Sequence, residues 1–203
     1  MSSQFVKAIA TLCLVVGIAA CATTYVMQSW VNHEAQKPKS VMIFGVTREE
    51  SLRRNYEDTL ARLLTTEGLR AETSYGLLKT EGEVPKEKVL DAVRKAGVES
   101  VFITRLVRLT KQVDAIPAPG PAWQAGPPPL GAYYSSYWPA YYADSYQLIE
   151  REFAYVESNL YQAQTSTLIM SVLTRTEDPN YGIGQVNELA KLIVNEFRRN
   201  GLV

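Results

Sequence analysis

The chain has 203 residues, and its 21 lysines and arginines balance its 21 aspartates and glutamates. This length is sufficient for one domain with a substantial apolar core. The balanced charge excludes the strongly basic composition that nucleic-acid binding requires, so we expect no nucleic-acid partner.

The first thirty residues predict the cellular compartment. A short leader with one positive charge, Lys7, precedes the apolar run AIATLCLVVGIAA at residues 8–20. This run is shorter than the roughly 20 residues that a membrane-spanning helix needs, and it has the length of a secretory signal. It ends in IAAC at residues 18–21, where an aliphatic residue and two small residues precede a cysteine.

This ending resembles the lipobox of bacterial lipoproteins. The resemblance implies that residues 1–20 are a signal peptide and that Cys21 carries diacylglycerol and a further acyl chain such as palmitate, which together anchor a protein stably to a membrane. Residue 22 is alanine, not the aspartate that retains enterobacterial lipoproteins in the inner membrane, so the resemblance favours the periplasmic face of the outer membrane. The alternative is an uncleaved membrane span that continues through residues 21–31, because no charged residue occurs from residue 8 to residue 32.

The remainder of the chain divides into a tether and one domain. Residues 21–40 are expected to comprise the lipidated cysteine and a polar tether, and residues 41–203 a periplasmic α/β domain. The domain begins with VMIFGV at residues 41–46, a continuous apolar run typical of a buried strand.

A helix is expected directly after this strand. The sequence TREE at residues 47–50 has the pattern of a capping box, in which Thr47 and Glu50 satisfy each other's backbone amides. Gly68 stands where a left-handed residue would end the helix. The apolar stripe of this helix is expected at Leu52, Tyr56, Leu60 and Leu63.

Three further elements precede the middle of the chain. Residues 69–75 form a polar stretch that predicts a second strand at an edge of the sheet. Pro85 and Gly97 stand at the start and the end of a second amphipathic helix. Residues 98–110 alternate as a third strand, whose apolar face is interrupted by Arg105.

Residues 113–146 interrupt this pattern with a segment rich in proline and tyrosine. After it, residues 152–162 and 167–174 predict two strands joined by a polar hairpin turn. Residues 167–174 are apolar on both faces, which is typical of a strand inside a sheet. The last helix has its apolar stripe at Val186, Leu189, Ala190, Ile193, Val194 and Phe197.

These elements predict an α/β (α+β) fold with a single mixed sheet. The expected order is β-α-β-α-β-insertion-β-β-α, with about five strands covered by three helices.

Together with the lipobox, the stretches RRNYEDTLARLLTTEGLRAETSY and VESVFITRLV resemble a group of envelope lipoproteins of Gram-negative bacteria. The alternation of elements is also similar to the amino-terminal domain of TolB and to the periplasmic domain of the curli-secretion lipoprotein. The resemblance implies a small α/β envelope domain and transfers no catalytic residue.

Few residues suit catalysis or metal binding. The single histidine, His33, lies in the expected tether, so it has no partner for a nucleophile pair or a zinc site, and we expect no cofactor and no metal. The acidic residues of the first helix, Glu49, Glu50, Glu57 and Asp58, together with Arg53 and Arg54, are interpreted as a solvated charged face. Glu157 and Arg105 are expected to form a structural ion pair.

The insertion at residues 113–146 allows three interpretations: a disordered loop, a surface for a protein or glycan partner, or a contact with the membrane surface. Tyrosine and tryptophan offer large rigid surfaces with a polar tip, which favours the second interpretation. The residues expected to contact a partner or ligand are Trp123, Tyr133, Tyr134, Tyr137, Trp138, Tyr141 and Tyr142.

The sequence therefore favours a non-catalytic, lipid-anchored envelope protein that acts as a binding or assembly component. The alternative is a hydrolase of envelope polysaccharide or peptidoglycan that uses carboxylates such as Glu150 or Glu157. Two carboxyl groups about 5–10 Å apart in one pocket would support this alternative.

Overall fold

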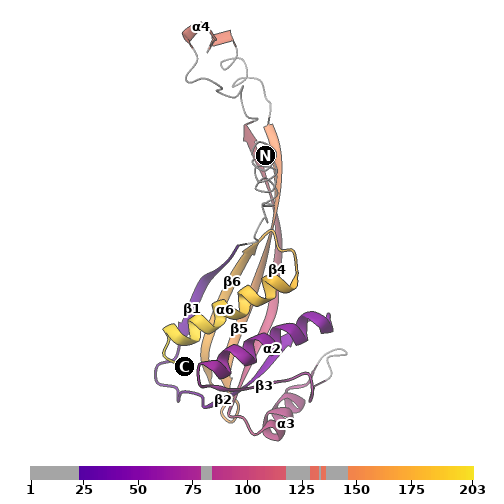
Figure 1. Cartoon of the computed structure of the whole chain (residues 1–203), viewed down its shortest axis with the longest axis vertical. Coiled ribbons are helices and arrows are strands. Elements are labelled where there is room, and N and C mark those ends of the chain that lie inside the picture. The colour runs from indigo at the N-terminus through magenta and orange to yellow at the C-terminus, as the bar shows by residue number, and fades with distance from the viewer. Residues whose placement is uncertain (1–22, 79–83, 118–128, 133, 136–145) are drawn as a thin grey trace, which may run out of the picture.

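The computed structural model describes residues 23–78, 84–117, 129–132, 134–135 and 146–203. Its centre is a six-stranded mixed sheet of order β1-β6-β5-β4-β2-β3, which confirms the predicted single mixed sheet with one strand more than expected (Figure 1). β2 pairs parallel with β3 and β4, and the other neighbours pair antiparallel.

The strands are β1 (Thr24–Val31), β2 (Ser40–Val46), β3 (Arg70–Thr73), β4 (Ser100–Pro117), β5 (Tyr146–Gln162) and β6 (Leu168–Glu177). The helices are α2 (Glu50–Thr66), α3 (Lys86–Ala96), α4 (Leu130–Ala132) and α6 (Ile183–Arg199).

The first strand corrects the expected tether. Residues 24–31 lie within the expected tether, or within the alternative membrane span, but they form β1 and pair with β6 from Thr24↔Thr176 to Val31↔Met170. Threonine, tyrosine, valine and tryptophan favour strands, and β6 offers these residues a free edge. None of the helices in the described part of the chain combines the length and the apolar composition that crossing a bilayer requires.

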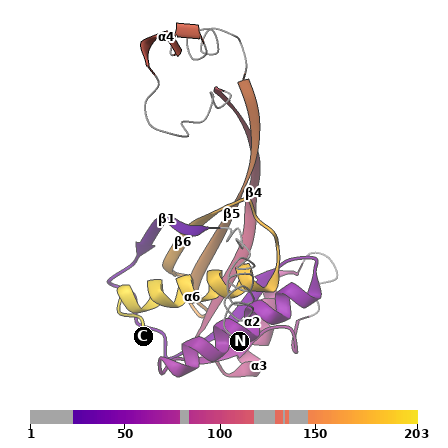
Figure 2. The same cartoon turned by 45° about the horizontal axis from the view of Figure 1, so that its top comes forward.

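Two helices cover one face of the sheet and one covers part of the other. α2 and α6 lie side by side, whereas α3 packs behind the β2–β3 end of the sheet (Figures 1 and 2). Ile43 belongs to the core under α2 and α6, together with Leu60 and Phe197. Its neighbour Met42 points the other way into a second core with Val93 of α3. β2 is thus buried on both faces, which explains its continuous apolar run.

The helix ends agree only partly with the sequence patterns. α2 begins at Glu50, but the expected capping box is absent, because its N-cap residue Glu49 makes no side-chain cap. The Thr47 hydroxyl instead accepts a hydrogen bond from the Glu49 amide at 3.2 Å. Gly68 has a φ angle of +93°, which confirms the predicted left-handed helix stop. Gly97, the predicted end of the second helix, is also left-handed, with φ +61°.

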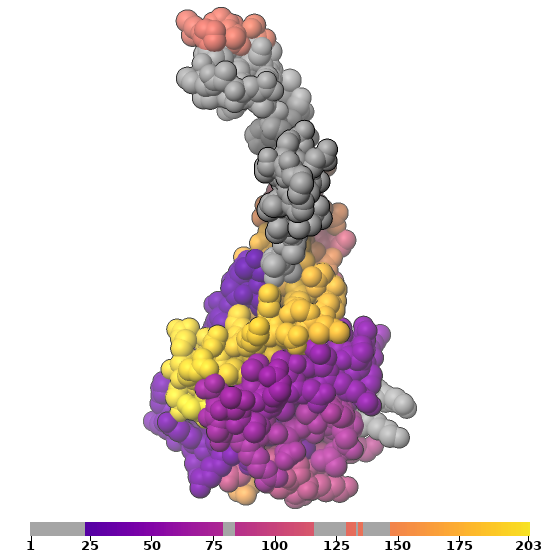
Figure 3. All heavy atoms as spheres, viewed as in Figure 1, coloured from indigo at the N-terminus to yellow at the C-terminus, as the bar shows by residue number. Residues whose placement is uncertain are grey.

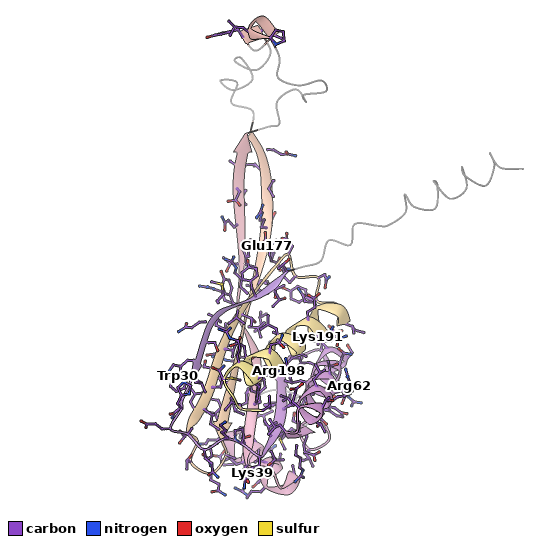
Figure 4. All side chains as sticks on the ribbon, turned by 60° about the vertical axis from the view of Figure 1, so that its left-hand side comes forward. Trp30, Lys39, Arg62, Glu177, Lys191 and Arg198 are labelled. Carbon is purple, nitrogen blue, oxygen red and sulfur yellow. The ribbon has the colours of Figure 1, made fainter. Side chains whose placement is uncertain are left out.

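β4 and β5 extend well beyond the body of the domain (Figures 1 and 4). They remain paired from Ser100↔Gln162 to Pro117↔Tyr146. β6 pairs with β5 only as far as Phe153, so residues 111–117 and 146–152 form a two-stranded extension of the sheet. These two segments are called the ribbon below. At its base the Glu152 carbonyl also accepts a hydrogen bond from the Asp178 amide at 2.7 Å. The expected insertion at 113–146 is therefore shorter, since β4 continues to Pro117 and β5 begins at Tyr146, and local pattern does not reveal that these flanking residues are strand partners.

Candidate functional site

A buried ion pair at the start of α2 corrects the expected charged face. Arg53 and Glu57 are 1% and 0% exposed, and Arg53 Nε lies 2.9 Å from Glu57 Oε1. Glu57 also accepts hydrogen bonds from the amides of Gly45, Ser74 and Tyr75, and from the Ser74 hydroxyl. One carboxylate thus joins α2 to the end of β2 and to the residues that follow β3. The sequence pattern missed this role, because Arg53 and Glu57 look like an ordinary exposed i,i+4 pair.

A second polar contact connects α2 to the sheet. The Tyr56 hydroxyl lies 2.8 Å from Thr104 Oγ1, which in turn lies 3.0 Å from Ser158 Oγ. Burial raises the pKa of Tyr56 far above its usual value, while the hydrogen bonds to Thr104 and Ser158 oppose that shift. Tyr56 is therefore neutral and structural at ordinary pH.

An open apolar groove lies between the amino-terminal halves of α2 and α6. Its volume is about 1170 Å³, and its floor includes Thr104 and Thr176 of the sheet. The two helices are joined near their carboxyl ends by the Arg198–Glu67 ion pair. Closer to the groove, the Thr59 hydroxyl donates to Asn187 at 3.0 Å. Figure 3 shows the two helices stacked on this face of the molecule. Most of the groove lining is apolar and includes Val46, Leu52, Leu106, Val156, Val186 and Leu189.

Among the described residues, the charged side chains that line the groove are Arg48, Arg53 and Arg105. Arg53 is paired with Glu57, and Arg105 with Glu157. Gln185, in the first turn of α6, also lines the groove. Its Oε1 accepts a hydrogen bond from the Tyr181 amide, whereas its buried Nε2 has no partner within the described part of the chain.

Tyr181 stands at the α6 side of the groove. Partial burial raises its pKa to about 12, and the hydrogen bond that its hydroxyl donates to Glu152 at 3.0 Å adds to this shift. Tyr181 therefore stays neutral, and its hydroxyl connects the α6 side of the groove to Glu152.

The ribbon exposes apolar side chains to solvent. Val113 and Leu148 are 59% and 69% exposed, and Leu106 and Leu109 of β4, just before the ribbon, are about half exposed. Lys111 and Glu150 form an exposed ion pair at 2.8 Å on it. The ribbon has no third strand and no helix on either face among the described residues, so these apolar groups have no core to enter.

The expected contact residues lie almost entirely outside the described residues. Tyr134 is described and is 55% exposed. The lipidation residue Cys21 falls in the undescribed part, as do the other expected contacts Trp123, Tyr133, Tyr137, Trp138, Tyr141 and Tyr142.

The predicted pair of Arg105 and Glu157 is confirmed. The two residues face each other across β4 and β5, with Arg105 Nη2 2.8 Å from Glu157 Oε2. Glu150 is seven residues before Glu157 on β5, so the two side chains point to opposite faces of the sheet. At roughly 3.3 Å per residue, the two positions are also about 23 Å apart along the strand. Glu150 and Glu157 therefore cannot act together as an acid and a base.

The described residues contain no cluster of three or more His, Cys, Asp or Glu side chains able to hold a metal.

Arginines and aromatic rings also stack on the sheet face opposite α6. The guanidinium of Arg175 lies 4.8 Å from the ring centre of Tyr25 and 4.9 Å from that of Phe153. Arg108 lies 4.0 Å from the ring centre of Tyr155. Sequence reasoning missed this cluster, since its members come from four strands that only the sheet brings together.

Comparison with known proteins gives similarity to solved structures alone, since no family model and no curated protein matches the chain. PelC from Paraburkholderia phytofirmans, solved as a dodecamer, is 11% identical over 88% of this chain and 97% of that chain, with a TM-score of 0.45. Lipoprotein GNA1162 from Neisseria meningitidis is 12% identical over 80% of this chain and 99% of that chain, with a TM-score of 0.39. A PDZ domain protein from Parabacteroides distasonis is 10% identical over 96% of this chain and 40% of that chain, with a TM-score of 0.36.

Proposed function

We propose that the chain is a non-catalytic, lipid-anchored component of the Gram-negative cell envelope, and that it binds or assembles with another envelope component through the ribbon. The lipobox-like ending at Cys21 supports the anchor. The ribbon, with its exposed apolar side chains, supports the binding role. The partner contacts the ribbon and the tyrosine-rich segment that joins its two strands.

The observation that carries this proposal is the isolation of the ribbon. A two-stranded hairpin without a third strand or a covering helix is marginally stable in water. Exposed apolar side chains such as Val113 and Leu148, next to the unpaired edge that β4 presents beyond Arg105, are typical of a surface that another molecule covers. A partner on the ribbon would bury these groups and stabilise the hairpin.

Two features support a non-catalytic role. Glu150 and Glu157 point to opposite faces of β5 and are each paired with a cation, Lys111 and Arg105. Glu57 is fully enclosed by Arg53 and by backbone amides, so its oxygens are already occupied. A polysaccharide hydrolase would need two carboxyl groups facing one pocket at about 5–10 Å.

The ribbon role is tested by replacing residues 118–145 with a two-residue Asn-Gly turn. Pro117 and Tyr146 are direct partners, so such a turn closes the hairpin. We expect the free energy of unfolding to change by less than about 1 kcal/mol, because the cores lie in the body of the domain. Photo-crosslinkers at positions 113 and 148 in intact cells should capture a defined envelope partner in the parent chain and lose it in the variant.

A crosslinker at Lys88, exposed on α3, is the matched control and should capture nothing that depends on residues 118–145. Loss of cooperative unfolding in the variant would place the tyrosine-rich segment in the core. Equal capture at positions 88 and 113 would contradict the ribbon as the contact surface.

The anchor is tested separately by Cys21→Ser. We expect this variant to leave the membrane fraction or to accumulate unprocessed, because serine carries no thiol for diacylglycerol. Membrane fractionation and the mass of the mature amino terminus measure both outcomes. Normal processing and undiminished membrane association of the variant would remove lipidation from the proposed function.

A further inference from the structure

We infer that the groove between α2 and α6 binds the acyl chain of a single-chain anionic lipid. This inference goes beyond the proposed function, since the groove lies in the body of the domain and shares no residue with the ribbon. It rests on the size of the groove, the chemistry of its walls and the charges at its lining.

The size and the walls favour a long apolar ligand. A volume of about 1170 Å³ is slightly above the roughly 300–1,000 Å³ that small-molecule sites occupy. Leu52 on α2 faces the groove from one side, and Val186 and Leu189 on α6 from the other. A peptide in this groove would bury backbone amides and carbonyls against apolar walls. An acyl chain has no such groups to satisfy.

The charges favour an anionic head. Among the described residues, three arginines and no carboxylate line the groove, and two of them, Arg53 and Arg105, are already paired with Glu57 and Glu157. Arg48 is exposed and has no ion-pair partner within the described part of the chain. Gln185 adds a second, independent signal, because its Nε2 is a buried donor without an acceptor in the described structure. A carboxylate head that accepts from that donor would also gain from the unpaired charge that Arg48 brings to the groove.

The test uses the full chain in phosphatidylcholine vesicles and a palmitate probe that carries a photoreactive diazirine on its chain. After irradiation, mass spectrometry maps the modified residues. We expect adducts on the first turns of α2 and α6 and on the adjoining part of β5. A probe with the same chain and an amine head should label these positions at least about tenfold less, because like charges repel at a desolvated site.

Gln185→Glu is the decisive variant. It keeps the oxygen that caps the Tyr181 amide but replaces the unpaired donor with a negative charge. Gly184→Asp is the matched control: it adds the same charge one residue earlier, at an exposed position with open space for a side chain. We expect Gln185→Glu to reduce palmitate labelling of the groove at least about tenfold and Gly184→Asp to leave it within about twofold.

Val186→Asp, which places a carboxylate in the wall itself, should likewise remove the adducts, while circular dichroism confirms that each variant is folded. The inference is overturned if adducts scatter over the surface, if the amine probe labels the groove equally, or if Gln185→Glu and Gly184→Asp behave alike. Labelling of the groove that appears only in Cys21→Ser would also overturn it, because the protein's own anchor would then be the occupant. None of these outcomes depends on capture of a partner by the ribbon, so the two proposals fail separately.

Discussion

Replacing Glu57 with alanine is expected to lower the free energy of unfolding by about 3–5 kcal/mol, the usual cost of removing one partner from a buried ion pair. Arg53 would remain in the interior with its charge no longer balanced by Glu57. The amides of Gly45 and Ser74 would also lose their acceptor. Because these amides lie at the end of β2 and directly after β3, the loss should loosen the junction between α2 and the sheet edge.

Urea unfolding followed by circular dichroism measures this change. Asp58→Ala is the matched control, because Asp58 is the adjacent carboxylate and makes an exposed hydrogen bond with the Tyr75 hydroxyl at 2.8 Å. We expect the control to cost less than about 1 kcal/mol. Equal effects of the two substitutions would mean that Glu57 contributes no more than a surface charge and that its enclosure has no energetic consequence.

Ile193→Asp should prevent the domain from folding. Ile193 is fully buried in the core that α6 forms with α2 and the sheet, near Phe197, whose ring packs edge-on against Phe102 at 5.4 Å. An aspartate there would bury a charge without a partner, at a cost of at least about 4 kcal/mol. This cost is comparable to the 5–15 kcal/mol that typically stabilises a domain.

Lys191→Asp on the same helix is the control, because Lys191 is exposed and projects away from the sheet (Figure 4). We expect its free energy of unfolding, obtained from the melting curve, to match that of the parent within about 0.5 kcal/mol. Cooperative melting of Ile193→Asp near the parent temperature would show that this stripe of α6 does not form the core described above.

Elements with strong local periodicity were predictable. α6 appeared as a stripe of apolar residues, and Ala190, Ile193 and Phe197 of that stripe are fully buried. β2 appeared as a continuous apolar run, and both of its faces are covered. In each case the spacing of side chains along one segment already specifies which of them must leave water.

Features that depend on a distant strand were not predictable. β1 was hidden in an expected tether, since Thr24–Val31 becomes a strand only when β6 offers it an edge. The full length of β4 and β5 also depends on their mutual pairing as far as Pro117↔Tyr146. A strand's hydrogen bonds go to another segment, so its extent is set by a partner that the local sequence does not contain.

The sequence by itself determined the single mixed sheet, the covering helices and the Arg105–Glu157 pair, because alternation places side chains on known faces. Only the tertiary structure decided that Arg53 and Glu57 are buried while Glu50 and Asp58 are exposed. Helix periodicity orients these residues around α2 but does not say how far the sheet and the Ser74 turn extend over them. The groove arises for the same reason: its walls come from α2, α6 and four strands, and its existence depends on how two helices diverge over the sheet.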